Sequence, residues 1–188
     1  PPSLTGGAPV ESAPQQGSTT AAQRTNDPVG PSFTLGAKPS RLDDKSVILF
    51  GGDAWRNWVQ RNGEPSQWVV QDEGSVQVRG GDAITSANFR DFQLHLEFRC
   101  PIMPDAQGQA KGNSGVYIHG RYEVQVLDSF DQPVAQNTCG AIYSIASPLV
   151  NATRPAGEWQ TYDIIFRAPR FDDDGNVTEP ARITVLLN

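Results

Sequence analysis

The sequence of 188 residues lacks the features that mark proteins bound to membranes or nucleic acids. No apolar stretch approaches the roughly 20 residues that an α-helix needs to cross a bilayer. No basic run is longer than two residues, and the net charge is -6, so there is little cationic surface for nucleic acid or anionic lipid. We therefore expect neither membrane insertion nor a nucleic-acid partner.

Cysteine is also scarce, and a secretion signal is missing. Cys100 and Cys139 are the two cysteines. Whether they form a disulfide or remain two buried thiols is left open by the sequence, because pairing requires close Cα atoms. The chain starts with Pro1-Pro2 and has no initiator Met, which indicates a mature or trimmed chain.

Apolar residues make up only 37% of the chain, and they are rarest at its start. Residues 1–40 are rich in Pro, Gly, Ser, Thr, Ala and Gln, with Phe33 as their one aromatic residue. Such a stretch buries too little apolar surface to offset its ordering entropy. We predict a disordered or extended tether over 1–40 and one domain over 41–188. A tether of this kind is typical of a secreted, periplasmic or cell-surface protein.

Residues 41–188 contain no long amphipathic helix but many short strand-like runs. In 92–99, apolar Phe and Leu alternate cleanly with Gln, His, Glu and Arg. Further runs between Gly-, Pro- and Asp-rich turns occur at 47–50, 67–71, 75–79, 115–119, 121–127, 161–167 and 183–187. This pattern predicts an all-β sandwich or barrel. The last run ends at Asn188 without a closing turn, so we expect the domain to be truncated at its C-terminus.

Alternation produces two dense polar rows: His95, Glu97 and Arg99 on one strand, and Arg121, Glu123 and Gln125 on another. In a sandwich the apolar face of each strand packs inward and the other face meets water or a ligand. Tyr117 and His119 are predicted to share the face of the second row, because Val116 and Ile118 take the opposite side. Polar groups about 6–7 Å apart along a strand suit hydrogen bonding to several hydroxyls. A plain solvated face with ion pairs is the alternative.

Residues 123–128, Glu-Val-Gln-Val-Leu-Asp, are similar to the E-x-D-x-x-E signature of laminarinase-type β-glucanases. In that signature a β-bulge returns the last acid to the face of the first two, which would place Asp128 beside Glu123 and Gln125. Here Gln125 replaces the central acid of the signature, and the shorter Asp128 replaces its last glutamate. Because displacement by two carboxylates needs two acids at a controlled separation, we do not expect an ordinary retaining hydrolase.

A longer series of motifs resembles the 3-keto-disaccharide hydrolase family. In chain order they are Leu-Phe-Gly-Gly at 49–52, the tryptophans Trp55, Trp58 and Trp68, then NSGVY at 113–117, YEVQVLDS at 122–129, CGAIY at 139–143 and GEWQTYD at 157–163. The resemblance covers about residues 47–188. It implies a concanavalin-like jelly-roll β-sandwich of two antiparallel sheets that acts on 3-keto-glycosides and 3-keto-disaccharides.

Chemistry on such a substrate needs one base rather than a nucleophile and acid pair. A ketone at C3 acidifies the proton on C2; a base removes it, the group at C1 leaves by β-elimination, and water adds to the enone. The amide at Gln125 is no obstacle to this reaction, and we expect no cofactor.

The predicted catalytic residues are Glu123 as base, Gln125 as partner of sugar hydroxyls or the keto oxygen, Asp128 to orient another of these groups or to bind a hydroxyl, and His119. Either His119, Arg121 or His95 would stabilise the enolate or protonate the leaving group. Further substrate contacts are predicted for His95, Glu97, Asn113, Tyr117, Arg121 and Tyr143. The sequence carries no strong metal signature, although Glu97, Glu123 and Asp128 together would suit a divalent ion.

A non-catalytic carbohydrate-binding module is the main alternative, because jelly-roll folds serve both purposes. Such a module would present aromatic platforms, whereas the predicted face is rich in acids and amides, which favours an enzyme. An interaction domain of a surface assembly is a second alternative, suggested by the tether, but it leaves the polar rows unexplained. We expect a carbohydrate partner whether the domain is an enzyme or a carbohydrate-binding module.

Overall fold

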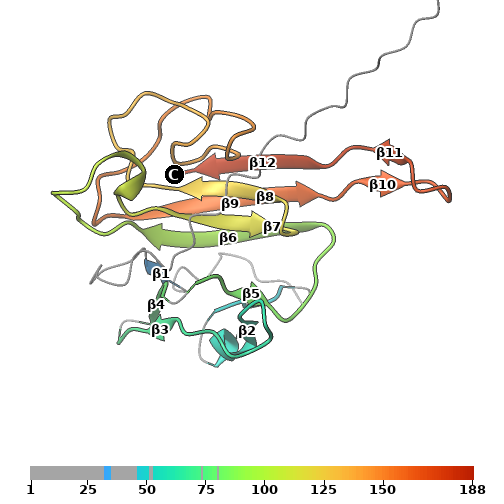
Figure 1. Ribbon diagram of the computed structural model, residues 1–188, viewed down its shortest axis with the longest axis horizontal. Helices are drawn as coiled ribbons and strands as arrows, with labels where there is room; N and C mark the ends of the chain where they lie inside the picture. The colour runs from blue at the N-terminus through green and yellow to red at the C-terminus, as the bar shows by residue number, and fades with distance from the viewer. Residues whose placement is uncertain (1–31, 35–45, 51–52, 73, 80) are drawn as a thin grey trace, which may run out of the picture.

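The computed structural model describes residues 32–34, 46–50, 53–72, 74–79 and 81–188. This part of the chain is nearly all β-structure (Figure 1). Its largest unit is a six-stranded antiparallel sheet. In spatial order its strands are β12 (Arg182–Leu187), β9 (Trp159–Arg167), β6 (Phe92–Arg99), β1 (Ser32–Thr34), β4 (Ser75–Gln77) and β3 (Val69–Val70).

Three two-stranded antiparallel pairs accompany this sheet: β7 (Ser114–Ile118) with β8 (Tyr122–Val126), β2 (Trp58–Val59) with β5 (Ile84–Thr85), and β10 (Arg170–Phe171) with β11 (Val177–Glu179). Two 3-10 turns, η2 (Ala54–Asn57) and η3 (Gly108–Ala110), are the helical elements of the described residues. None of the helices described is long and apolar enough to span a membrane.

The core lies between the β7–β8 pair and the large sheet. Figure 1 shows β7 and β8 lying over β6 and β9, and the buried side chains of both layers form one cluster: Phe98, Tyr162, Ile164 and Phe166 from the large sheet, and Ile118, Val124 and Val126 from the pair. Each strand contributes alternate residues, as a half-buried strand must. The predicted all-β, jelly-roll type of sandwich is confirmed.

Both cysteines are free thiols buried beside this core. Cys139 Sγ lies 3.1 Å from the hydroxyl of Tyr162, which itself donates to the main-chain oxygen of Gln125. Burial raises the pKa of both thiols, which keeps them neutral. Of the two arrangements left open by the sequence, the structure has the separate buried thiols.

Three residues of the predicted tether belong to the sheet. Ser32–Thr34 form β1, which pairs with β4 on one side and β6 on the other. A strand this short is stabilised by main-chain hydrogen bonds to its two neighbouring strands, which do not depend on the side chains. The amino-acid composition of residues 1–40 therefore did not indicate this strand. Residues 1–31 and 35–40 of the predicted tether lie outside the described part, and for them the tether stays a prediction.

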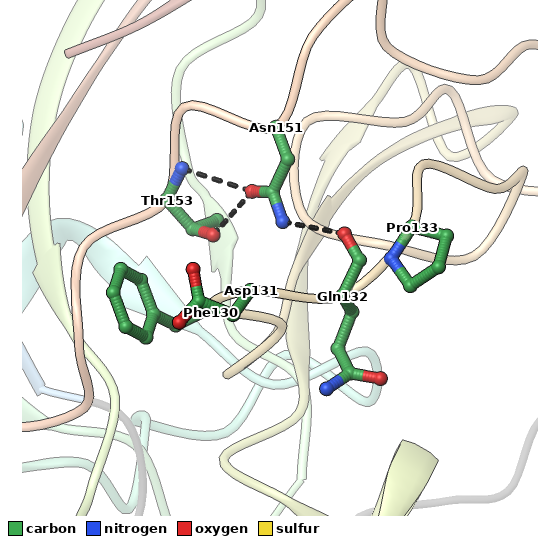
Figure 2. A pocket seen from close by; sticks show the side chains of 6 residues that line it. All are labelled: Phe130, Asp131, Gln132, Pro133, Asn151 and Thr153. Atoms are coloured by element: carbon green, nitrogen blue, oxygen red, sulfur yellow. Dashed lines mark hydrogen bonds between the residues drawn. The ribbon is translucent and has the colours of Figure 1, made fainter.

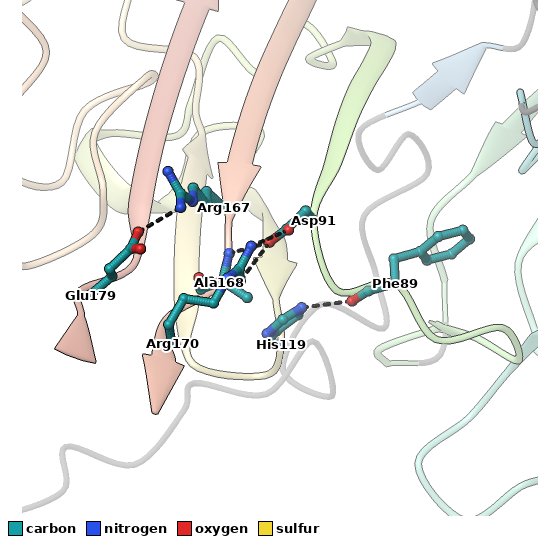
Figure 3. Close-up of polar contacts among 7 residues, drawn as sticks. All are labelled: Phe89, Asp91, His119, Arg167, Ala168, Arg170 and Glu179. Atoms are coloured by element: carbon teal, nitrogen blue, oxygen red, sulfur yellow. Dashed lines mark hydrogen bonds and ion pairs between the residues drawn. The ribbon is translucent and has the colours of Figure 1, made fainter. Parts of the chain in front are cut away.

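A carboxylate joins the start of β6 to the end of β9. Asp91 Oδ1 accepts a 2.7 Å hydrogen bond from the Ala168 amide, and Arg170 contacts both carboxylate oxygens (Figure 3). These hydrogen bonds lower the pKa of Asp91 to about 2, and the bond from Arg170 has the largest effect. Arg167 of β9 also pairs with Glu179 of β11 at 2.5 Å, so this end of the sheet is held by charged groups.

Candidate active site

Glu123 lies in β8 on the face turned away from the core. Its neighbours Tyr122 and Val124 pack against or within the core, so alternation directs Glu123 to the other side. It pairs with Tyr117 of β7, whose hydroxyl donates a 2.8 Å hydrogen bond to Glu123 Oε2. The two residues that the sequence placed on one face are therefore in direct contact.

Tyr143 flanks Glu123 on its other side. Its amide donates to the Glu123 carbonyl at 2.9 Å, and Ile142 bridges Val124. Since Ile142 packs against the core, antiparallel pairing directs Tyr143 to the outer face beside Glu123. Tyr117 is 50% exposed and Tyr143 38%, so the carboxylate lies between two accessible aromatic side chains.

Gly115 provides the space that the carboxyl group occupies. A Cβ atom at this position would lie 2.1 Å from Glu123 Oε1, closer than atoms can approach. Gly115 is also the direct partner of Gln125 in the β7–β8 pair. The carboxyl group of Glu123 is thus directed along the strand toward Gln125.

On balance, the surroundings of Glu123 raise the pKa of its carboxyl group. Burial raises the pKa of the carboxyl group, the negative charge of Asp82 raises it further, and the hydrogen bond from Tyr117 opposes both effects. Asp82 is held by Arg61 at 2.7 Å. A carboxylate with a raised pKa is a stronger base, as proton abstraction requires. Sequence patterns gave no sign of Arg61 or Asp82, because they come from loops that only the fold brings to this face.

Gln125 is the next outward residue of β8 and is 1% exposed. Its Nε2 donates to Gln109 Oε1 at 3.2 Å and to Asn113 Oδ1 at 3.3 Å. Its Oε1 is buried and has no hydrogen-bond partner among the described residues. Asn113, a predicted substrate contact, is thus a neighbour of Gln125, while Gln109 was missed because η3 lies in a connection without a strand pattern.

Asp128 follows two consecutive residues, Val126 and Leu127, that both pack in the core. The bulge predicted at this point stays a prediction, because β7 and β8 pair in regular register as far as Val126, where β8 ends. The Asp128 side chain is 5% exposed and pairs with Lys111 Nζ at 2.8 Å. Lys111 lies between Gln109 and Asn113 in the chain, so Asp128 borders the Gln125 network. No contact with Glu123 is present within the described ranges.

His119 does not share the face of Glu123. It occupies the β7–β8 turn with φ of 53°, and its Nε2 lies 2.7 Å from the Phe89 carbonyl oxygen (Figure 3). Its ring meets the buried Phe166 edge-on, with centroids 4.7 Å apart. The prediction that His119 shares this face is wrong, because strand alternation ends at the turn. The left-handed backbone of His119 directs its ring to the core side. Arg121, also in this turn, is exposed.

His95 and Glu97 lie on the opposite side of the sandwich. Leu94, Leu96 and Phe98 of β6 pack in or against the core, so the alternate residues face outward from the large sheet. There His95 Nδ1 contacts Asp163 Oδ1 of β9 at 2.7 Å. The two polar rows therefore do not form one site, because each sheet turns its polar face away from the other.

Because the two outer faces are apart, the structure does not bring Glu97, Glu123 and Asp128 together as a site for a divalent ion. Glu97 is on the other outer face, and Asp128 is engaged by Lys111. Within the described ranges, no three His, Cys, Asp or Glu side chains gather closely enough to hold a metal ion.

A hollow of about 400 Å³ lies in the loops after β8, lined by Phe130, Asp131, Gln132, Pro133, Asn151 and Thr153 (Figure 2). Asn151 Nδ2 donates to the carbonyls of Ser129 and Gln132, each at 2.8 Å, and its Oδ1 accepts from the amide and hydroxyl of Thr153. The Asn151 amide thus joins the two loops that form the hollow. No predicted site residue lines it.

Comparison with known proteins gives a family match and similarity to solved structures. Residues 45–188 match the family model described as a 3-keto-alpha-glucoside-1,2-lyase-like domain. Among solved structures, the chain is similar to a candidate glycosyl hydrolase from Parabacteroides distasonis ATCC 8503, at 39% sequence identity and a TM-score of 0.69. The alignment covers 76% of this chain and 61% of that one, so the chain spans about three fifths of its length. A search of curated proteins gave no match.

Proposed function

Because the chain belongs to the family of 3-keto-alpha-glucoside-1,2-lyase-like domains, we propose that it cleaves glycosides oxidised at C3, with Glu123 as the base. Similarity to a candidate glycosyl hydrolase supports a glycoside-cleaving activity. The choice of a 3-keto substrate depends on the chemistry that this site can support.

Glu123 would remove the proton from C2 of the 3-keto sugar. The electrons of the C2–H bond form a C1=C2 double bond, the C1–O bond breaks, and the aglycone oxygen takes a proton from solvent water as it leaves. Water then adds its hydroxyl to C1 and releases its other proton to solvent, which replaces the proton taken by the aglycone, while C2 receives a proton. The protonated Glu123 can return the proton that it took, so one carboxyl group serves both half-reactions.

One observation carries this proposal: Glu123 is a partly buried carboxylate, oriented by Tyr117, without a second free carboxylate beside it on β8. Displacement mechanisms require two carboxyl groups about 5–9.5 Å apart. Here the next outward position is the amide of Gln125, and the nearby carboxylates Asp82 and Asp128 are paired with Arg61 and Lys111. An elimination needs only the one base.

The test compares a 3-keto-glucoside with its unoxidised parent as substrates. We expect release of the aglycone from the keto form alone, and a loss of about 10²- to 10⁴-fold in kcat for Glu123→Gln. Circular dichroism and thermal unfolding of the variant establish that it is folded. Equal turnover by wild type and Glu123→Gln would rule out Glu123 as the base.

A carbohydrate-binding module remains the second candidate, and the exposed Tyr117 and Tyr143 beside Glu123 favour it, since aromatic rings pack on sugar faces. Binding of both sugars without aglycone release would support this candidate over the enzyme.

A further inference from the structure

Two buried glutamines of this fold differ in one respect. Gln125 and Gln160 are each 1% exposed. The Gln160 amide is satisfied at both ends by Arg154, whose main-chain N–H donates to Oε1 at 3.0 Å and whose carbonyl accepts from Nε2 at 3.4 Å. Gln125 uses only its Nε2, and its Oε1 has no partner in the described part of the chain.

The orientation of the Gln125 amide follows from main-chain groups nearby. Gln109 Nε2 donates to the Asn137 carbonyl at 3.0 Å, and Asn113 Nδ2 donates to the Gln109 carbonyl at 2.9 Å. A carbonyl only accepts, so these contacts fix which end of each side chain is nitrogen. The oxygens of Gln109 and Asn113 consequently face Gln125 and require its NH₂ group. The unpartnered atom of Gln125 is therefore its oxygen.

An unsatisfied buried acceptor is costly to a fold, and native proteins keep few of them. This one belongs to the residue two positions along the strand from Glu123 on the same face, so that the two Cα atoms are about 6–7 Å apart. Glu123 itself bends over Gly115, the cross-strand partner of Gln125. Gln109, Asn113 and Glu123, which border the amide, are all partly exposed. A ligand held at Glu123 can therefore approach Gln125 by displacing side chains rather than main chain.

We propose that Gln125 Oε1 is a specificity-determining acceptor for a hydroxyl group of the sugar, and that it does not bind the keto oxygen. This inference rests on the proposed function for the position of the substrate. A keto oxygen needs a donor, and the NH₂ group of Gln125 is already occupied by Gln109 and Asn113. With the proton at C2 taken by Glu123 and the ketone at C3, the hydroxyls on the side of the ring away from C2 are those at C4 and C6, so one of these is the hydroxyl bound.

The experiment measures kcat/KM for a 3-keto-glucoside and for its 4-deoxy and 6-deoxy forms. Three proteins are compared: wild type, Gln125→Met, which removes the acceptor at similar volume, and Gln160→Met, which removes the satisfied buried amide. We expect wild type to lose about 10- to 1000-fold on one deoxy substrate. In Gln125→Met that penalty should disappear because the parent substrate falls to the same level. In Gln160→Met the penalty should persist.

Turnover of all three substrates at equal rates by wild type would overturn the assignment of Gln125 and leave the proposed function intact. If no 3-keto-glucoside is cleaved, the proposed function fails. Calorimetric binding of unoxidised glucoside and its two deoxy forms to the same three proteins then tests whether Gln125 accepts a hydrogen bond from a sugar hydroxyl. Weaker binding of one deoxy form than of the parent glucoside by wild type and Gln160→Met, but not by Gln125→Met, would support the acceptor role. Equal affinities for all three sugars, or no binding, would overturn it.

Discussion

The hydroxyl of Tyr117 donates a 2.8 Å hydrogen bond to Glu123 Oε2 across the β7–β8 pair. Burial raises the pKa of both groups, first by desolvating their charged forms. The bond itself acts in opposite directions, lowering the pKa of Glu123 and raising that of Tyr117. The proton therefore stays on the phenol, and the carboxylate is held in a fixed orientation as a base.

Tyr117→Phe should shift the pH dependence of cleavage. Removing the donor raises the pKa of Glu123, and a base must be deprotonated to act, so the acidic limb of kcat/KM should move to higher pH. Measurement of kcat/KM on a 3-keto-glucoside across pH tests this. Tyr122→Phe, which removes a hydroxyl on the core side of the same strand, is the matched control and should leave the limb in place. A limb that moves to lower pH in Tyr117→Phe would contradict the prediction.

Gly115→Ala should damage activity more than stability. The added Cβ would lie 2.1 Å from Glu123 Oε1, and the end of this flexible side chain can move aside, so the fold tolerates the change. A misplaced base is costly, and we expect kcat/KM to fall about 10- to 100-fold. Thermal unfolding should shift by only a few degrees, about the effect of 1 kcal/mol.

The double variant Gly115→Ala with Glu123→Gln is the control for this effect. If Gly115 acts through the Glu123 carboxylate, the double variant should be no less active than Glu123→Gln alone. Additive losses would show that Gly115 contributes in another way.

Lys111→Met should destabilise the fold by leaving Asp128 buried without its partner. Removing one member of a buried ion pair costs about 3–5 kcal/mol, and the lower end applies because Lys111 is 35% exposed. The free energy of unfolding in urea measures the effect. Lys111→Met combined with Asp128→Asn should recover part of the loss, since no charge remains buried. A single variant within 0.5 kcal/mol of wild type, on the order of an ordinary surface substitution, would exclude a stabilising role for the pair.

Asp91→Asn should lower stability at neutral pH but not in strong acid. The pKa of Asp91 in the fold, about 2, is below its ordinary value of 3.8. A lowered pKa stabilises the fold above the ordinary value, and this contribution is lost as pH falls through the folded value. The difference in unfolding temperature between wild type and variant should be constant above about pH 4 and decrease toward pH 2. A difference that is independent of pH over this range would contradict the role of the Arg170 contact.

Local patterns were sufficient where a residue's neighbours along one strand determine its surroundings. Alternation in 121–127 placed Glu123 and Gln125 on the outer face, and alternation in 115–119 placed Tyr117 on the same face, where it contacts Glu123. Alternation failed for His119, because a turn does not continue the period of the strand. It also gave no information on Gln109, Arg61 and Asp82, which come from connections without a repeating pattern.

The sequence by itself therefore determined the all-β class, the inward and outward faces of each strand, and the family motifs, because these depend on residues close together in the chain. Only the tertiary structure decided which outer faces meet. It placed the row of His95 and Glu97 on the opposite side of the sandwich from Glu123, because two packed sheets must turn their polar faces away from each other. It also determined that Gln125 has its NH₂ group occupied and its oxygen free, since that depends on main-chain carbonyls at Gln109 and Asn137, brought together by the fold.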